Sequence, residues 1–175
     1  SPQIYGNYWY DKPIFFYWEL IAAFSVFGVT DFAARFFPAL FASAGLLLTY
    51  ALARRLYDAR TAFWSVVILG SCVLYGFLAK LILTDLTLFV FFGGTLGAFC
   101  LGYRDGRRGY LYLAYACAGL GVLTKGPVGF LLPGLVILVY LAVRRDLRAL
   151  GRIALPTGLL VLAAVCAPWY IYMYL

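Results

Sequence analysis

Eight charged side chains lie within or at the ends of long apolar segments, and half of them are acidic. They are Asp11, Lys12, Glu19, Asp31, Arg35, Lys80, Asp85 and Lys125. Lysine and arginine side chains bind phosphate, whereas a carboxylate takes a proton from a hydroxyl group or ligates a divalent ion. Ionisable groups at membrane depth usually line a water-filled cavity that has a function. The pattern therefore predicts a polar site.

Three of these residues lie where solvation is poorest. The stretch AKLILTD joins two apolar segments almost without polar residues, which leaves Lys80 and Asp85 at or below the membrane surface. Lys125 stands in TKGP between two short apolar segments, so we expect that turn to dip below the interface as well. Snorkelling of a single lysine would explain Lys80 but not the lowering of a whole turn.

The rest of the chain is too apolar for a soluble core. Its 175 residues are 65% hydrophobic and 12% charged, with a mean hydropathy of +0.93. Soluble domains carry about 25% charged residues. The composition therefore predicts an all-α, polytopic membrane helix bundle.

Six apolar segments after residue 35 have the character of membrane helices. They are 36–53, 61–79, 86–103, 110–123, 128–143 and 153–175. Within them we expect Pro38 in a first turn, Thr61 and Thr84 as N-caps, and kinks at Pro156 and Pro168.

The predicted organisation is a single transmembrane domain over 1–175. Residues 1–35 form an external loop and an interfacial helix, and residues 36–175 form about six membrane helices.

The turns between these segments alternate in charge, which predicts the orientation of the chain. Ten of the fourteen basic residues lie in 54–60, 104–109 and 144–152, which share one face of the bundle. The positive-inside rule makes this face cytoplasmic. These arginines are interpreted as determinants of topology and contacts to lipid headgroups, and their spread over short loops excludes a nucleic-acid partner.

The segment 14–30 decides where Asp11 and Lys12 lie. It is only about seventeen residues long and contains Glu19, which favours an amphipathic helix along the interface over a span. The preceding stretch YGNYWYDKPIFFYW is rich in the Trp and Tyr residues typical of membrane interfaces. In this arrangement all eight charges share one external cavity. If the segment crossed the membrane, Asp11 and Lys12 would face the cytoplasm.

Four stretches of the chain, taken in order, resemble a known family. They are YWYDKPIFFYW, FGVTDFAARFFPAL, LAKLILTDLTLFVFF and GLGVLTKGPVGFLLPG. They resemble segments of the bacterial aminoarabinose transferases and of the wider group that includes the protein O-mannosyltransferases. The second proline of the family's Lys-Pro-Pro is Ile14 here. The family's acidic residue in the first external loop, its expected catalytic base, would lie before Ser1, so we expect a central fragment of such an enzyme.

The resemblance implies a membrane glycosyltransferase of the GT-C superfamily that uses a sugar on a polyprenyl phosphate. Its fixed cations would stabilise the phosphate as it leaves, and a carboxylate would take or orient the acceptor's proton. The candidates for binding the donor phosphate are Lys12, Arg35, Lys80 and Lys125. Asp85 and Asp11 are the catalytic candidates, and either could also ligate a divalent metal ion.

Two rival functions stay open at this point. A transporter or lipid flippase would also carry charges in the membrane, although the chain shows no internal repeat. A non-catalytic scaffold would leave the acid–base cluster without a role. If the chain is a transferase, we expect it in the bacterial inner membrane with its site on the periplasmic face. Its sugar and its acceptor, whether lipid A, another glycan or a protein, are left open by the sequence.

Overall fold

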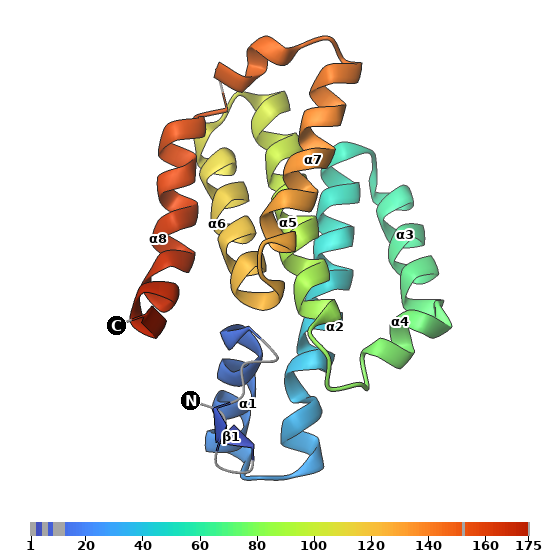
Figure 1. The fold of residues 1–175 in the computed structure, drawn as a ribbon. Helices are drawn as coiled ribbons and strands as arrows, with labels where there is room; N and C mark the ends of the chain where they lie inside the picture. Colours follow the sequence, from blue (N-terminus) through green and yellow to red (C-terminus); the bar gives the residue numbers. More distant parts are fainter. Residues whose placement is uncertain (1–2, 5–6, 9–12, 152, 175) are drawn as a thin grey trace.

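The structure, a computed structural model, is a helical bundle, and it describes residues 3–4, 7–8, 13–151 and 153–174 (Figure 1). Two short strands, β1 (Gln3–Ile4) and β2 (Asn7–Tyr8), pair in antiparallel register. The helices are α1 (Ile14–Phe27), α2 (Asp31–Leu56), α3 (Ala59–Ser71), α4 (Val73–Leu78), α5 (Asp85–Asp105), α6 (Arg108–Lys125), α7 (Val128–Val143), the 3₁₀ helix η1 (Leu147–Gly151) and α8 (Leu155–Tyr174). The prediction of an all-α bundle is confirmed.

Three of the described helices are long and apolar enough to cross a membrane: α2, α5 and α8, the last over Leu155–Met173. Helices α1 and α7 are apolar but shorter. With 14 residues, α1 is about 21 Å long, less than the roughly 30 Å of a bilayer core. Its length therefore supports the interfacial placement, which stays a prediction together with the count of six membrane helices.

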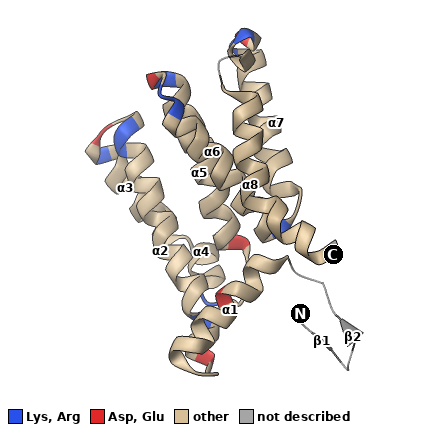
Figure 2. Ribbon diagram, turned by 90° about the vertical axis from the view of Figure 1, so that its left-hand side faces the viewer, with Lys and Arg blue, Asp and Glu red and all other residues tan. Residues whose placement is uncertain are grey.

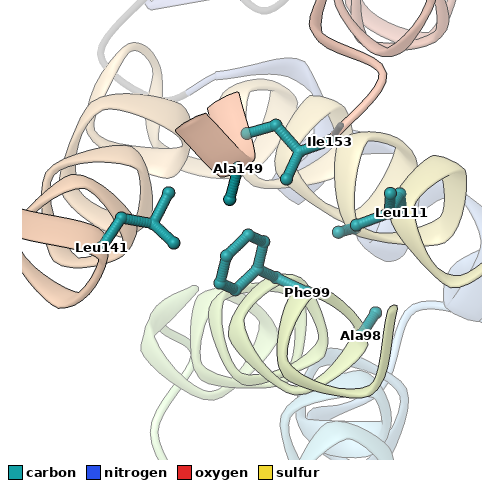
Figure 3. Close-up of a cluster of buried hydrophobic side chains, with 7 residues drawn as sticks. Ala98, Phe99, Leu111, Leu141, Ala149 and Ile153 are labelled. Carbon is teal, nitrogen blue, oxygen red and sulfur yellow. The ribbon is translucent and has the colours of Figure 1, made fainter. Parts of the chain in front are cut away.

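Helix α5 lies at the centre of the bundle, antiparallel to α6, with α2 and α7 packed against it (Figure 1). One buried hydrophobic cluster joins α5, α6 and α7 to η1 and the chain that follows it (Figure 3). Its members are Ala98, Phe99, Leu111, Ala114, Leu141, Ala149 and Ile153. This packing holds the two central helices and α7 as one unit.

The basic turns gather at one end of the bundle. Figure 2 shows the Lys and Arg segments at the ends of the helices where α2 passes to α3, α5 to α6 and α7 to η1. The opposite end carries charges of both signs. The expectation that the three basic turns share one face is therefore confirmed, and we call this the arginine-rich end.

Several local predictions need correction. The predicted span 61–79 is broken at Cys72, whose backbone is extended (φ −65°, ψ 119°) between α3 and α4. Gly70 and Ser71 precede the break, and the Ser71 hydroxyl donates to the Ile68 carbonyl at 3.0 Å. Both residue types weaken a helix.

Two helix starts also differ from the prediction. Asp58, not Thr61, caps α3, because its carboxylate accepts the Thr61 amide hydrogen at 2.7 Å. Thr30 caps α2, so this helix begins earlier and Pro38 lies in its interior.

The remaining cap and kink predictions are met in part. Thr84 occupies the N-cap position of α5 without a side-chain hydrogen bond. Pro156 lies in the first turn of α8, where proline is tolerated and produces no kink, and Pro168 lies inside that helix.

Helices α6 and α7 touch backbone to backbone beside the turn that joins them. A Cβ atom added at Gly129 would lie 2.1 Å from the carbonyl carbon of Gly121. Only a residue without a side chain fits at this contact. The crossing therefore fixes the angle at which α7 leaves the TKGP turn.

We expect Gly129→Ala to destabilise the protein by about 1–3 kcal/mol or more, because two backbones must separate to admit the methyl group. Gly134→Ala is the matched control in the same helix, since nothing lies within 4 Å of its added Cβ. That control should leave stability unchanged or raise it slightly. Thermal unfolding in detergent measures both variants, and equal melting temperatures would contradict the close crossing.

Candidate active site at the Asp85–Lys125 pair

The structure joins two of the predicted site residues directly. Lys125 Nζ lies 2.5 Å from Asp85 Oδ1. Asp85 is the first residue of α5 and Lys125 the last of α6, so the antiparallel packing of these helices brings the two together across forty positions of sequence. The pair lies at the end of α5 opposite the arginine-rich end.

Local structure favours both charges where they stand. The positive N-terminal end of α5 stabilises the Asp85 carboxylate, and the negative C-terminal end of α6 stabilises the Lys125 ammonium. Gly126 then ends α6 in a conformation with φ +71°, which glycine adopts readily, and its amide donates to the Val122 carbonyl at 2.8 Å. Pro127 follows at the N-cap of α7. The TKGP turn thus presents Lys125 at a helix end.

Both members of the pair remain open to a ligand. The side chain of Lys125 is 46% exposed and that of Asp85 is 38% exposed. Exposed ion pairs contribute only about 0–1 kcal/mol to stability. The ammonium group has three hydrogen-bond donors, so two are left for a phosphate while one contacts Asp85. The pair therefore contributes little to stability and stays accessible to a ligand.

A buried polar contact lies next to the pair. Thr87, in the first turn of α5, donates its hydroxyl hydrogen to Glu19 Oε1 on α1 at 2.8 Å. Glu19 is 5% exposed and Thr87 is 1% exposed. Burial raises the pKa of Glu19 to about 7, although the hydrogen bond from Thr87 acts in the opposite direction. The sequence analysis placed Glu19 among the eight charges but did not identify Thr87 as its partner. The only sign of a buried partner in the sequence is a single glutamate within an apolar helix.

Aromatic contacts hold α1 against the rest of the bundle. The ring of Phe15 meets that of Phe91 on α5 edge to face at 5.3 Å, and Trp18 meets Trp169 on α8 at 5.8 Å. These contacts position the start of α1, directly after Asp11 and Lys12. Those two residues lie outside the described part of the chain, so their catalytic and phosphate-binding roles stay predictions.

Arg35 and Lys80 are exposed and are not brought into the pair. Arg35 lies in the second turn of α2, and Lys80 lies in the turn between α4 and α5. Neither forms an ion pair with another residue among those the structure describes. Their predicted role as phosphate ligands therefore stays a prediction.

The predicted metal site is not formed by the described residues alone. Among them, no three His, Cys, Asp or Glu residues are grouped as metal ligands. Asp85 Oδ1 accepts a hydrogen bond from the Lys125 ammonium group. A metal role for Asp85 together with Asp11 stays a prediction, and we derive no chemical step from it.

The bundle, its apolar helices and its matches to known proteins define an integral, polytopic membrane protein. Residues 11–172 match the family model described as dolichyl-phosphate-mannose-protein mannosyltransferase. The chain belongs to this family, which confirms the resemblance carried by the four motifs.

Individual relatives agree with this assignment. The undecaprenyl phosphate-alpha-4-amino-4-deoxy-L-arabinose arabinosyl transferase of Pseudomonas aeruginosa is 33% identical over 178 residues, covering 97% of this chain and 32% of that protein. An uncharacterized protein of Aquifex aeolicus is 31% identical over all of this chain and 35% of its own length.

Solved structures share the fold. ArnT from Cupriavidus metallidurans in the apo state superposes with a TM-score of 0.91 at 29% identity, over 97% of this chain and 33% of ArnT. The crystal structure of the same protein bound to undecaprenyl phosphate gives a TM-score of 0.90 at 30% identity, over 95% of this chain and 32% of ArnT. The chain thus spans about a third of the length of the relatives that it matches.

Proposed function

We propose that this protein is a membrane glycosyltransferase that moves a sugar from a polyprenyl-phosphate donor to an acceptor of the cell envelope. The observation that carries the proposal is the exposed Asp85–Lys125 pair at the end of the bundle opposite the arginine-rich end. The likeness to ArnT bound to undecaprenyl phosphate supports a donor of this chemical class.

The pair suits the chemistry of such a transfer. An acceptor hydroxyl oxygen would attack the anomeric carbon of the sugar, and the bond from that carbon to the phosphate oxygen would break. The leaving polyprenyl phosphate keeps the bonding electrons and gains negative charge, which Lys125 would stabilise, with Lys12, Arg35 and Lys80 as further cations. The proton of the hydroxyl would pass to Asp85, or to Asp11 if that residue is the nearer base.

The charge distribution suggests where this happens. With the arginine-rich end in the cytoplasm, the site opens on the periplasmic side of the bacterial inner membrane. Lipid A, another envelope glycan or a protein would be reached from there.

The test is to supply the protein, as the cell makes it, with an undecaprenyl-phosphate-linked sugar in proteoliposomes. We expect release of undecaprenyl phosphate together with transfer of the sugar to envelope lipid or protein, both detected by mass spectrometry. A nucleotide sugar offered without the lipid-linked donor should give no transfer. Envelope lipids and glycoproteins that are identical in cells with and without the gene would contradict the proposal.

A further inference from the structure

An apolar groove runs between α2, α5 and α6 toward the arginine-rich end. Its volume is about 380 Å³, within the range of small-ligand pockets. On α2 it is lined by Leu48 and Leu52, and on α6 by Leu113 and Cys117. Gly94 of α5 lets α6 approach, because an added Cβ would lie 3.1 Å from Cys117 Sγ.

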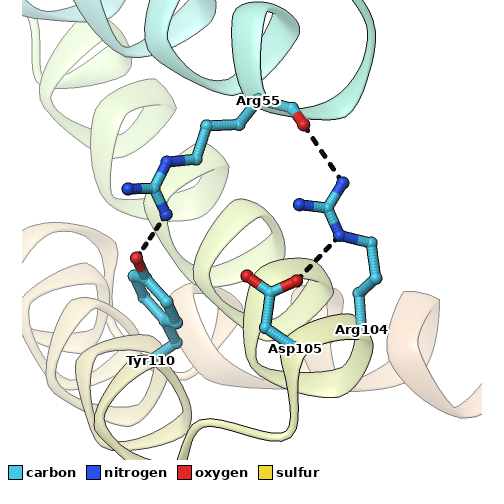
Figure 4. Close-up of polar contacts among 4 residues, drawn as sticks. All are labelled: Arg55, Arg104, Asp105 and Tyr110. Atoms are coloured by element: carbon cyan, nitrogen blue, oxygen red, sulfur yellow. Dashed lines mark hydrogen bonds and ion pairs between the residues drawn. The ribbon is translucent and has the colours of Figure 1, made fainter.

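The groove ends in two polar side chains. Arg55 Nη1 donates a hydrogen bond to Tyr110 Oη, and its guanidinium carbon lies 5.6 Å from the centre of the Tyr110 ring (Figure 4). The neighbouring Arg104 donates to the Arg55 carbonyl at 3.1 Å and is neutralised by Asp105 at 2.9 Å. No carboxylate of the described chain pairs with Arg55 itself. A cation therefore stands at the mouth of an otherwise apolar groove.

This combination fits one kind of occupant. A guanidinium group binds phosphate with two parallel hydrogen bonds, and a tyrosine hydroxyl is well placed at the level of lipid headgroups. An apolar groove leading away from such a site fits an acyl chain. We infer that the protein binds an anionic phospholipid here, with its phosphate on Arg55 and Tyr110 and one acyl chain along Leu48, Leu52 and Leu113.

This site is separate from the proposed donor site. Asp85 and Arg104 lie at opposite ends of α5, about 28 Å apart along the helix axis. The lipid is therefore drawn from the leaflet at the arginine-rich end, whereas the donor pair faces the other leaflet. Loss of lipid binding at Arg55 should therefore leave sugar transfer at the Asp85–Lys125 pair unchanged, and loss of transfer should leave lipid binding unchanged.

The test measures binding of phosphatidylglycerol and phosphatidylcholine to the purified protein as the cell makes it, by native mass spectrometry. We expect tighter binding of phosphatidylglycerol, and a loss of about ten-fold or more in Arg55→Gln, the size expected for a hydrogen bond to a charged group. Arg55→Lys should retain part of the affinity. Arg148→Gln, an equal charge change in η1 at the same end of the bundle, should bind like wild type.

A second variant tests the groove rather than the charge. Leu113 is 51% exposed, so Leu113→Trp should fill the groove without disturbing the core and should weaken binding while Arg55 stays in place. Inorganic phosphate at millimolar concentration should not displace the lipid. The proposal would be overturned if Leu113→Trp bound phosphatidylglycerol with wild-type affinity, or if inorganic phosphate alone displaced the lipid. Either result would show that only the surface charge is recognised. An unchanged preference for phosphatidylglycerol in Arg55→Gln would also overturn the proposal. That result is expected if a polypeptide segment, and not a lipid, fills the groove.

Discussion

Replacing Asp85 with asparagine should slow sugar transfer by about 10²- to 10⁴-fold, the usual contribution of a positioned general base. The amide keeps the shape of the side chain at the start of α5 but cannot take a proton from the acceptor. The variant should fold normally, because the lost ion pair with Lys125 is exposed and contributes little to stability. Rates of undecaprenyl phosphate release in proteoliposomes measure the effect.

The matched control is Asp146→Asn, at the arginine-rich end, where the carboxylate accepts a hydrogen bond from Tyr103 at 2.7 Å. An amide oxygen can accept the same bond, so transfer should stay at the wild-type rate. If Asp85→Asn also retained that rate, the base would lie elsewhere, with Asp11 the next residue to change.

Removing the ammonium group in Lys125→Ala should lower the transfer rate by about 10- to 150-fold. This range corresponds to about 1.5–3 kcal/mol for a hydrogen bond to a charged group that is felt mainly as the leaving phosphate gains charge. Lys125→Arg should recover only part of the rate, because the planar guanidinium group cannot take the position of a point charge. Protein level and melting temperature should stay close to wild type.

The double variant separates two roles for the pair. If Asp85 only orients Lys125, then Asp85→Asn and Lys125→Ala together should be no slower than Lys125→Ala alone. If each acts on a different atom of the reaction, their effects should multiply. Arg148→Ala, at the opposite end of the bundle, should have no effect on transfer, and wild-type transfer by Lys125→Ala would place the donor phosphate on other residues.

Much of this architecture follows from composition and charge. The long apolar runs predicted the membrane bundle, and the alternation of basic turns predicted which helix ends lie together. The same reasoning selected Asp85 and Lys125 individually, from their depth beside apolar segments. Their contact could not be predicted from either segment alone, because it depends on α5 and α6 packing side by side with their ends in register.

The errors also have physical causes. The break at Cys72 falls inside a run that is apolar on both sides, so hydropathy gives no sign of it. Thr61 has the chemistry of an N-cap, but Asp58 three residues earlier accepts the Thr61 amide hydrogen, so the helix begins at Ala59 and Thr61 lies inside its first turn. The bond between Glu19 and Thr87 joins residues 68 positions apart, and only tertiary packing brings a hydroxyl to that carboxyl group.

That buried bond has a mechanical consequence. It is a hydrogen bond between α1 and the first turn of α5. The aromatic contacts between α1 and α5, such as Phe15 with Phe91, depend less strictly on direction than this hydrogen bond does. A rotation of α5 that moves Asp85 would therefore either carry α1 with it or break this buried hydrogen bond at a cost. The position of Asp85 is thus coupled to the position of α1, although the two lie far apart in sequence.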